Sequence, residues 1–234
     1  MNLPKISVIT VVWNDAEGLE RTIKSVINQT YENVEFIVID GDSSDGTVEV
    51  IEKYADKIDY WVSEKDEGIY DAMNKGIKVA SGMWVNFMNA GDTFVSEEVL
   101  QSIEWNVYNE KTLIYGNKML DNQVIFPLSL RLLEAGEIHA NHQSMFFNKS
   151  ILQDKLFYDL KYKIYADYEL VNRIYKDDSM IIKYIDVVIA DFEGGGVSST
   201  VSMQKRKDKY MIVYKSYGMI GLIKSIFYRV RKLM

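Results

Sequence analysis

The sequence predicts an α/β protein in which a mostly parallel sheet is flanked by helices and followed by a helical tail. Strand-like and helix-like segments alternate from residue 5 to residue 88, and this order is typical of a parallel sheet with helices on both faces. At 234 residues and 47% apolar content, the chain can fill one large core. No repeat or clear linker interrupts it, so we expect one domain over residues 1–200 and a basic amphipathic helix over residues 201–234.

The N-terminal part of the chain supplies four expected strands and three expected helices. Residues 5–12 form a β-branched run, and residues 34–40 form a second run that is typical of a buried strand. The helix-like segments carry apolar residues at helical spacing. We expect strands at residues 5–12, 34–40, 59–64 and 83–88, and helices at residues 17–29, 45–58 and 68–80.

The pattern changes in the C-terminal part. Residues 96–108 indicate a helix capped by Ser96, with acidic residues in its first turn. The glycines at 194–196 suit a hinge or a loop that closes over a ligand. We further expect strands at residues 112–120, 123–127 and 142–147, a helix at residues 165–177, and one or two strands within residues 180–193.

Polar residues follow several of the expected strands at the point where each strand ends. Trp13 and Asn14 follow the first strand, Asp40 ends the second, and Asn89 and Asp92 follow the fourth. Ligands of parallel sheets bind beyond the carboxyl ends of the strands. These side chains are therefore predicted to converge on one ligand-binding edge.

Composition excludes several classes of protein and of site. The net charge of −7 divides into +6 over residues 209–234 and −13 before them, so the acidic body does not suit a general nucleic-acid binder. The chain has no cysteine, which excludes disulfides and thiolate chemistry and removes the usual zinc ligands. The N-terminus lacks the pattern of a signal peptide. We therefore expect a cytoplasmic location.

The residue types at the expected edge favour binding of a nucleotide and a cation. Asp40 could accept hydrogen bonds from a nucleotide's base or ribose, and Trp13 could stack on a base or simply be an aromatic at the rim. Asn89 and Asp92 lie in the sequence NAGD, which is either an ordinary turn or a site for a hard divalent cation. Mg²⁺ and Mn²⁺ favour oxygen ligands and retain substrate phosphates.

Two long segments carry a resemblance to a known family. The stretches SVITVVWNDAEGLERTIKSVINQTYENVEFIVIDGDSSDGT and DEGIYDAMNKGIKVASGMWVNFMNAGDTF resemble glycosyltransferase family 2, and in particular bacterial enzymes of exopolysaccharide and O-antigen assembly. The resemblance covers roughly residues 5–195. It implies the Rossmann-like GT-A fold and an inverting hexosyl- or N-acetylhexosaminyltransferase. Such an enzyme moves a sugar from a nucleotide-diphosphate sugar, here a UDP-sugar, to a hydroxyl of a saccharide acceptor.

The resemblance also implies donor-binding roles. Trp13 stands where the family has an aromatic residue against the base, with Asn14 beside it, and Asp40 matches the acid that contacts uracil. Many relatives have an arginine where this chain has Met73. We expect Asp71 and Asn74 to compensate for it on the donor side.

The NAGD motif stands in the place of the family's Asp-x-Asp metal motif. Asn89 replaces its first aspartate and Gly91 its second, which leaves Asp92 as the one carboxylate of the motif. The resemblance therefore implies a divalent cation, Mn²⁺ or Mg²⁺, held by Asp92 and Asn89, with Asp92 also on the donor side.

A catalytic base and an acceptor site follow from the same resemblance. The family's Glu-Asp pair at the start of a late helix matches Ala166 and Asp167, so Asp167 would take the proton of the acceptor hydroxyl. The alternative is an ordinary helix N-terminal aspartate. His142 and Gln143 match a His-Gln pair near the acceptor or the pyrophosphate, and we interpret His139 as structural or as a surface residue.

The basic tail leaves two interpretations open. It is either a helix packed on the domain or an interfacial helix on anionic lipid. A lipid-linked acceptor favours peripheral contact with the inner face of the plasma membrane through residues 209–234.

Two rival functions are weighed against the transferase. A sugar-nucleotide nucleotidyltransferase would carry a Gly-rich basic loop after the first strand, and residues 11–18 contain no basic residue. A membrane-surface module with a degenerate nucleotide pocket stays open, because Asn89, Gly91 and Ala166 depart from the family pattern.

Overall fold

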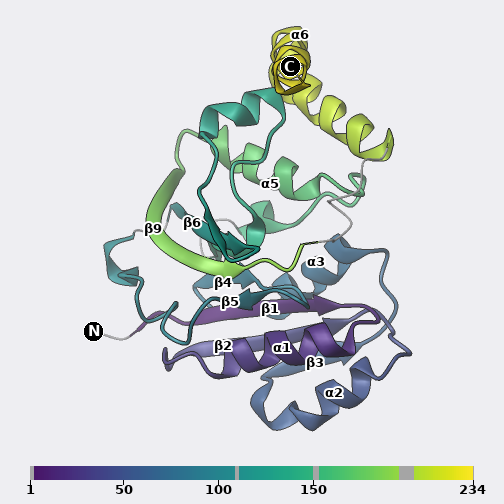
Figure 1. Ribbon diagram of the computed structural model, residues 1–234, viewed down its shortest axis with the longest axis vertical. Helices are drawn as coiled ribbons and strands as arrows, with labels where there is room; N and C mark the ends of the chain where they lie inside the picture. The colour runs from purple at the N-terminus through teal and green to yellow at the C-terminus, as the bar shows by residue number, and fades with distance from the viewer. Residues whose placement is uncertain (1–2, 109–110, 150–152, 195–202, 234) are drawn as a thin grey trace.

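The computed structural model describes residues 3–108, 111–149, 153–194 and 203–233. Its centre is one sheet with the strand order β3-β2-β1-β4-β8-β6-β9-β5, to which β7 is added through its pairing with β6. Helices cover both faces of this sheet, and the long C-terminal helix α6 lies at one end of the molecule (Figure 1). The predicted α/β fold class is confirmed.

The N-terminal half of the sheet is parallel and places the predicted edge. β1 (Ile6–Val12) lies between β2 (Val34–Asp40) and β4 (Trp84–Phe87), and β3 (Tyr60–Ser63) extends the sheet beyond β2. In the register, Val12 is opposite Asp40 and Ile9 is opposite Phe87. The loops that follow β1, β2 and β4 therefore leave from the same side of the sheet.

The second half mixes strand directions. β8 (Met145–Asn148) pairs antiparallel with β4, and β6 (Thr112–Leu120) pairs antiparallel with β8. β9 (Ile181–Asp191) runs parallel to β6, and its far end pairs with the short β5 (Thr93–Phe94). β7 (Gln123–Ile125) forms a hairpin with β6.

The side chains of β1 point alternately to the two faces of the sheet, and the core is therefore divided into two layers. Ile9 and Val11 face one buried cluster, whereas Ile6, Val8 and Val12 face the other. The first layer is covered by α3 (Ile69–Val79) and α5 (Ala166–Tyr175), and the second by α1 (Ala16–Ile27) and α2 (Thr47–Lys53) (Figure 1). Burial on both faces explains why β1 and β2 read as continuous apolar runs.

The helix expected at residues 96–108 is wrong. The segment forms successive turns and the short 3₁₀ helix η2 (Trp105–Val107), although Val99 and Leu100 are buried as a helix would require. The Gln29 side chain donates to Ser96 O (2.7 Å) and accepts from Leu100 N (3.1 Å). These two backbone groups would pair with each other in an α-helix, so a side chain from the end of α1 replaces a helical hydrogen bond.

Other differences concern element ends. α2 is shorter than residues 45–58, and the 3₁₀ helix η1 (Ala55–Lys57) completes that segment. The strand expected at residues 142–147 begins at Met145, because His142–Ser144 form the 3₁₀ turn η4. Of the one or two strands expected within residues 180–193, the structure forms one, at residues 181–191. Two further 3₁₀ helices are η3 (Leu130–Ala135) and η5 (Gln153–Leu156).

The tail forms α6 (Met203–Leu233), which breaks its helical geometry at Gly218 (φ 62°, ψ −153°). Its first half packs on the domain through the buried Ile212 and Val213 and lies against η3. The domain boundary expected at residue 200 and most of the glycine segment fall in residues 195–202, outside the described residues. No helix among the described residues is long and apolar enough to span a membrane.

Candidate active site

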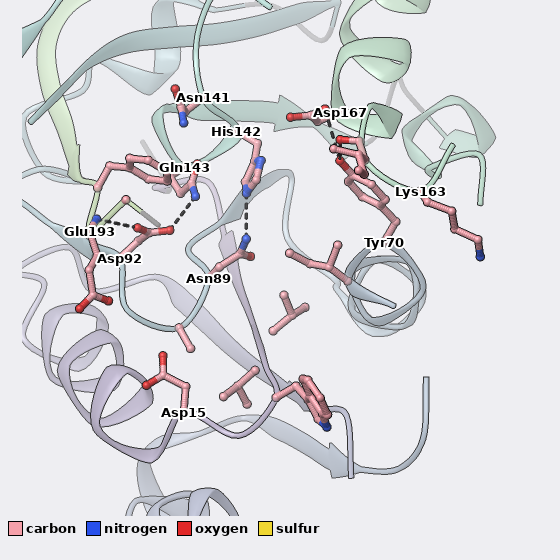
Figure 2. Close-up of a pocket in the computed structure, with 18 residues that line it drawn as sticks. Asp15, Tyr70, Asn89, Asp92, Asn141, His142, Gln143, Lys163, Asp167 and Glu193 are labelled. Carbon is pink, nitrogen blue, oxygen red and sulfur yellow. Dashed lines mark hydrogen bonds between the residues drawn. The ribbon is translucent and has the colours of Figure 1, made fainter. Parts of the chain in front are cut away.

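A pocket of about 250 Å³ opens at the carboxyl edge of the parallel strands. It is lined by the end of β1, the loop after β4, the start of α3, the η4 turn, the start of α5 and the residues that follow β9. Figure 2 shows Asp15 at one end of this pocket and Asn141 at the other, with Asn89 and Asp92 between them. We call this the main pocket.

Six of the residues expected at the site from sequence line the main pocket; these are Trp13, Asn89, Asp92, His142, Gln143 and Asp167. They come from loops, a turn and the start of a helix, and the first and last of them, Trp13 and Asp167, are 154 positions apart in the chain, so only the fold brings them together. Trp13 is 69% exposed and offers a free aromatic face at the rim. Asn14, Asp40, Asp71 and Asn74 do not line the pocket.

Asp40 and Asn14 form hydrogen bonds within and between the loops next to the main pocket. Asp40 is fully buried and accepts hydrogen bonds from Ser43 N (3.0 Å), Ser43 Oγ (2.5 Å) and Ser63 Oγ (2.6 Å). Asn14 has a positive φ of 50°, and its side-chain oxygen accepts from Ser44 N at 2.8 Å. The Asn14 side chain thus joins the loop after β1 to the loop after β2, and the Asp40 side chain joins the loop after β2 to the end of β3.

Asp71 and Asn74 also have protein partners. Asn74 Nδ2 donates to Tyr158 O (3.0 Å), and its Oδ1 accepts from Tyr158 N (2.8 Å). Asp71 accepts from Glu67 N at 3.1 Å and lies 4.0 Å from the Lys75 ammonium. Asn74 therefore ties α3 to the segment before α5, and Asp71 orders the start of α3.

Asp92 is a buried carboxylate oriented by the η4 turn. Its Oδ2 accepts from Gln143 Nε2 at 2.6 Å, and its Oδ1 accepts from Glu193 N at 3.0 Å (Figure 2). Burial raises the pKa of Asp92 to about 6, although these hydrogen bonds oppose the rise. The carboxylate is therefore held by two donors at the centre of the pocket.

Asn89 is oriented by His142. Its side-chain amide lies 2.9 Å from His142 Nε2 (Figure 2). Burial lowers the pKa of His142 to about 4, so near neutral pH the imidazole is uncharged and Nε2 can accept from Asn89 Nδ2. That orientation leaves Asn89 Oδ1, which is buried, without a hydrogen-bond partner in the described part of the chain.

The oxygen atoms at Asn89 and Asp92 fit a hard divalent cation that completes its shell with water and phosphate. The described residues contain no cluster of three or more histidine, cysteine or acidic side chains suited to a metal. The unpartnered Asn89 Oδ1 and the Asp92 carboxylate are instead the kind of sparse oxygen set that Mg²⁺ or Mn²⁺ shares with a diphosphate.

Asp167 lies across the pocket from this pair, in the first turn of α5. Its Oδ1 accepts from Tyr168 N at 2.7 Å and lies 3.3 Å from the Tyr70 hydroxyl (Figure 2). Tyr70 also lies 2.7 Å from Ile164 O, to which it donates. Burial raises the pKa of Asp167 to about 6. This half-buried carboxylate is able to accept a proton near neutral pH.

The structure adds pocket residues that sequence reasoning did not select. Asp15 caps α1 by accepting from Gly18 N (2.9 Å), and Lys163 brings a cation from the loop before α5. Tyr70 and Glu193 contact the two acids described above. Asp15 could have been found because it follows β1 directly, whereas no local pattern distinguishes Lys163, Tyr70 or Glu193.

A family model described as "Glycosyl transferase family 2" matches residues 7–181. The chain belongs to glycosyl transferase family 2. An uncharacterised glycosyltransferase of Mycobacterium tuberculosis is 35% identical over 211 residues, which cover 84% of this chain and 78% of the relative. A PGL/p-HBAD biosynthesis glycosyltransferase of Mycobacterium bovis is 28% identical over 212 residues, covering 86% of this chain and 82% of the relative.

Solved structures show the same fold at low sequence identity. TarS of S. aureus, solved in complex with UDP, superposes with a TM-score of 0.72 at 18% identity and covers 91% of this chain. This chain spans 65% of that TarS structure. The mannosyltransferase PcManGT of Pyrobaculum calidifontis, solved with GDP-Man and Mn²⁺, superposes with a TM-score of 0.66 at 16% identity, covering 95% of this chain and 73% of that one. The family 2 chain therefore has the GT-A fold.

Asn74→Ala is expected to destabilise this glycosyltransferase without removing a direct contact to the nucleotide, because Asn74 does not line the main pocket. The substitution leaves the backbone N–H and C=O of the buried Tyr158 without their partner, which costs about 1–3 kcal/mol. Urea unfolding would measure the loss, with the exposed Asn106→Ala as the matched control. Unchanged stability together with lost nucleotide binding would instead place Asn74 in the donor site.

Proposed function

We propose that this chain is an inverting glycosyltransferase that moves a sugar from a UDP-sugar to a hydroxyl of a saccharide acceptor. The observation that carries the proposal is the arrangement of the main pocket, in which Asp167 faces the Asn89–Asp92 pair across the space for a substrate. One side suits a diphosphate and its cation, and the other carries a base.

The choice of donor is supported by the neighbours of the same fold. TarS has been solved with UDP and with UDP-GlcNAc, and PcManGT with GDP-Man and Mn²⁺. We propose a UDP-sugar of the hexose or N-acetylhexosamine class for this chain. The exposed Trp13 would stack on the base. The predicted uracil contact of Asp40 is not kept, because Asp40 is fully buried and does not line the main pocket; with Asn14, Asp71 and Asn74 it would support the donor side by ordering the loops around it.

Asp92 and Asn89 would hold the divalent cation, Mg²⁺ or Mn²⁺. When bound, that cation would neutralise the negative charge on the departing diphosphate. His142 and Gln143, assigned to the acceptor side from sequence, would border the acceptor while each orients one of these two ligands. Outer partners of this kind fix the direction of the ligand oxygens.

Asp167 would act as the general base. The acceptor hydroxyl oxygen forms a bond to the anomeric carbon while the bond from that carbon to the diphosphate oxygen breaks, and its electrons leave with the diphosphate. The hydroxyl proton passes to Asp167. Because attack comes from the face opposite the leaving group, the anomeric configuration inverts. A base with a pKa of about 6 is well matched to this task near neutral pH.

Asp167→Asn is expected to lower the transfer rate by a factor of roughly 10²–10⁴ and to leave UDP binding nearly unchanged. In the parent enzyme the base must be deprotonated, so with a pKa of about 6 the rate should fall as the pH drops below 6 and level off above it. Transfer assays across pH and UDP titrations would measure both. Loss of UDP binding in the variant would make Asp167 a structural residue.

The metal role is tested with Asp92→Asn, which preserves shape and removes charge. UDP, GDP and CDP are each added to the purified protein with and without Mn²⁺, and the melting temperature is measured. We expect a metal-dependent rise for UDP that disappears in Asp92→Asn. An equal metal-dependent rise in the variant would contradict the metal role. No rise with any nucleotide in the parent protein would favour the degenerate membrane-surface module.

We also propose that the acceptor is lipid-linked and that α6 lies on the inner face of the plasma membrane, in a cytoplasmic protein. Six exposed apolar residues follow Gly218; these are Met219, Ile220, Ile223, Ile226, Phe227 and Val230. At about 3.6 residues per turn they share about one third of the helix circumference. Gly221 and Ser225 are buried on the opposite side. Arg229 and Arg231 are exposed, and no acidic residue follows Asp208.

The double variant Ile223→Asp and Phe227→Asp should reduce binding to vesicles that contain phosphatidylglycerol by roughly tenfold or more, because both side chains lose their apolar contact with lipid. Co-sedimentation would measure this, with Met203→Asp, an exposed methionine at the start of α6, as the control. Parent-like binding of the double variant would contradict the membrane role.

A further inference from the structure

A second pocket of about 250 Å³ adjoins the main pocket. It lies between β6, the segment after β7 and the loop before η4, and Asn141 lines both pockets. Lys118 also lines the second pocket, and its ammonium lies 4.4 Å from the ring centre of Phe192, a main-pocket residue. Asn141 stands at the far end of the main pocket from Asp15 (Figure 2). The second pocket therefore adjoins the end of the main pocket that Asn141 lines.

Two polar side chains of the second pocket are buried without partners. His139 is 2% exposed, and neither of its ring nitrogens has a hydrogen-bond partner in the described part of the chain. Ser144 is 1% exposed, and its Oγ likewise has none there. The Tyr115 ring meets the edge of the His139 ring at 4.5 Å between centroids, which orients the imidazole. Burial lowers the pKa of His139 to about 4, so the ring is neutral near pH 7 and carries one donor and one acceptor.

The remaining lining of the second pocket is largely apolar. Ile125 at the end of β7 and Phe126, Pro127 and Leu128 after it form one wall, and Phe126 is 65% exposed. A cavity of about 150 Å³ already admits a benzene ring, so this pocket has room for one substituted six-membered ring. It combines an apolar wall with a few convergent polar groups, as small-molecule sites do.

The unpartnered atoms of His139 and Ser144 indicate which kind of ligand the second pocket can bind. A purely apolar group would leave the nitrogens of His139 and the hydroxyl of Ser144 buried and unpaired, which is unfavourable for each group. A pyranose ring can place its apolar face on the wall and its hydroxyls on His139 and Ser144. Hydroxyls both donate and accept, which matches a neutral imidazole and a serine.

We propose that the second pocket binds a sugar ring of the acceptor, the ring next to the sugar that receives the transferred residue. This inference rests on the proposed transferase function. It makes the preferred acceptor at least a disaccharide, with its terminal sugar in the main pocket near Asp167 and the adjoining sugar between Phe126 and His139.

The test uses the ring carbon–proton NMR signals of the histidines in the whole protein with UDP and Mg²⁺. The chain has two histidines, so His139→Phe assigns the His139 signal. Lactose, cellobiose, maltose and chitobiose are each titrated against the methyl glycoside of their non-reducing sugar. We expect at least one disaccharide to shift the His139 signal and to bind roughly tenfold more tightly than its monosaccharide partner.

The role of the second pocket is tested by comparing variants of its residues with control variants elsewhere in the protein. Ser144→Ala and Phe126→Ala should each weaken disaccharide binding roughly three- to tenfold and leave UDP binding unchanged. Ser225→Ala removes another buried serine whose Oγ has no partner among the described residues, and Val107→Ala shortens another exposed apolar side chain, which is 65% exposed; both variants should bind disaccharides like the parent protein.

Two failures are distinguishable. If UDP binds but no disaccharide shifts the His139 signal, or if the Ser144 and Phe126 variants bind disaccharides as the parent does, the second-pocket assignment is overturned and the transferase proposal stands. If UDP itself does not bind, the transferase proposal falls and the inference falls with it.

Discussion

The arrangement of the site depends on two hydrogen bonds made by Asn86 inside the sheet. Asn86 is fully buried in β4, and its Nδ2 donates to Gln143 O (3.0 Å) and Met145 O (2.9 Å). These bonds hold the η4 turn beside the end of β4, where the sheet passes from parallel to antiparallel pairing. His142 and Gln143 are thereby placed against Asn89 and Asp92. Without that turn, the motif after β4 would lose the partners that orient its amide and its carboxylate.

Burial raises the pKa values of Asp92 and Asp167 to a similar level, although their partners suit the two carboxylates to different roles. Desolvation raises the pKa of both Asp92 and Asp167 to about 6. Asp92 is tied by Gln143 and by a backbone N–H, which suits a ligand with a fixed direction. Asp167 keeps one short hydrogen bond and a longer contact with Tyr70, which leaves it available to a proton. The difference lies in the partners, because the residue type is the same.

Sequence periodicity predicted the parallel half of the sheet well, because β1 and β2 are buried on both faces and their apolar runs are unambiguous. It failed at residues 96–108, where Gln29, distant in sequence, takes the hydrogen bond that a helix would need. The sequence left open whether His139 is a structural or a surface residue, and the fold buries it beside the second pocket. A local pattern carries no information about a partner that is remote in the chain.

The sequence by itself determined the order of strands and helices, the polar residues that end each strand and the family resemblance, because these follow from local spacing and from contiguous motifs. Tertiary structure decided which polar residues share a pocket. Asp40, Asn14 and Asn74 lie in the strand, loop and helix expected for them, yet their side chains are hydrogen-bonded to other parts of the protein, whereas Asn89 Oδ1 stays without a partner in the described part of the chain. Whether a polar atom is satisfied depends on the three-dimensional neighbours that it meets, and only the folded chain supplies them.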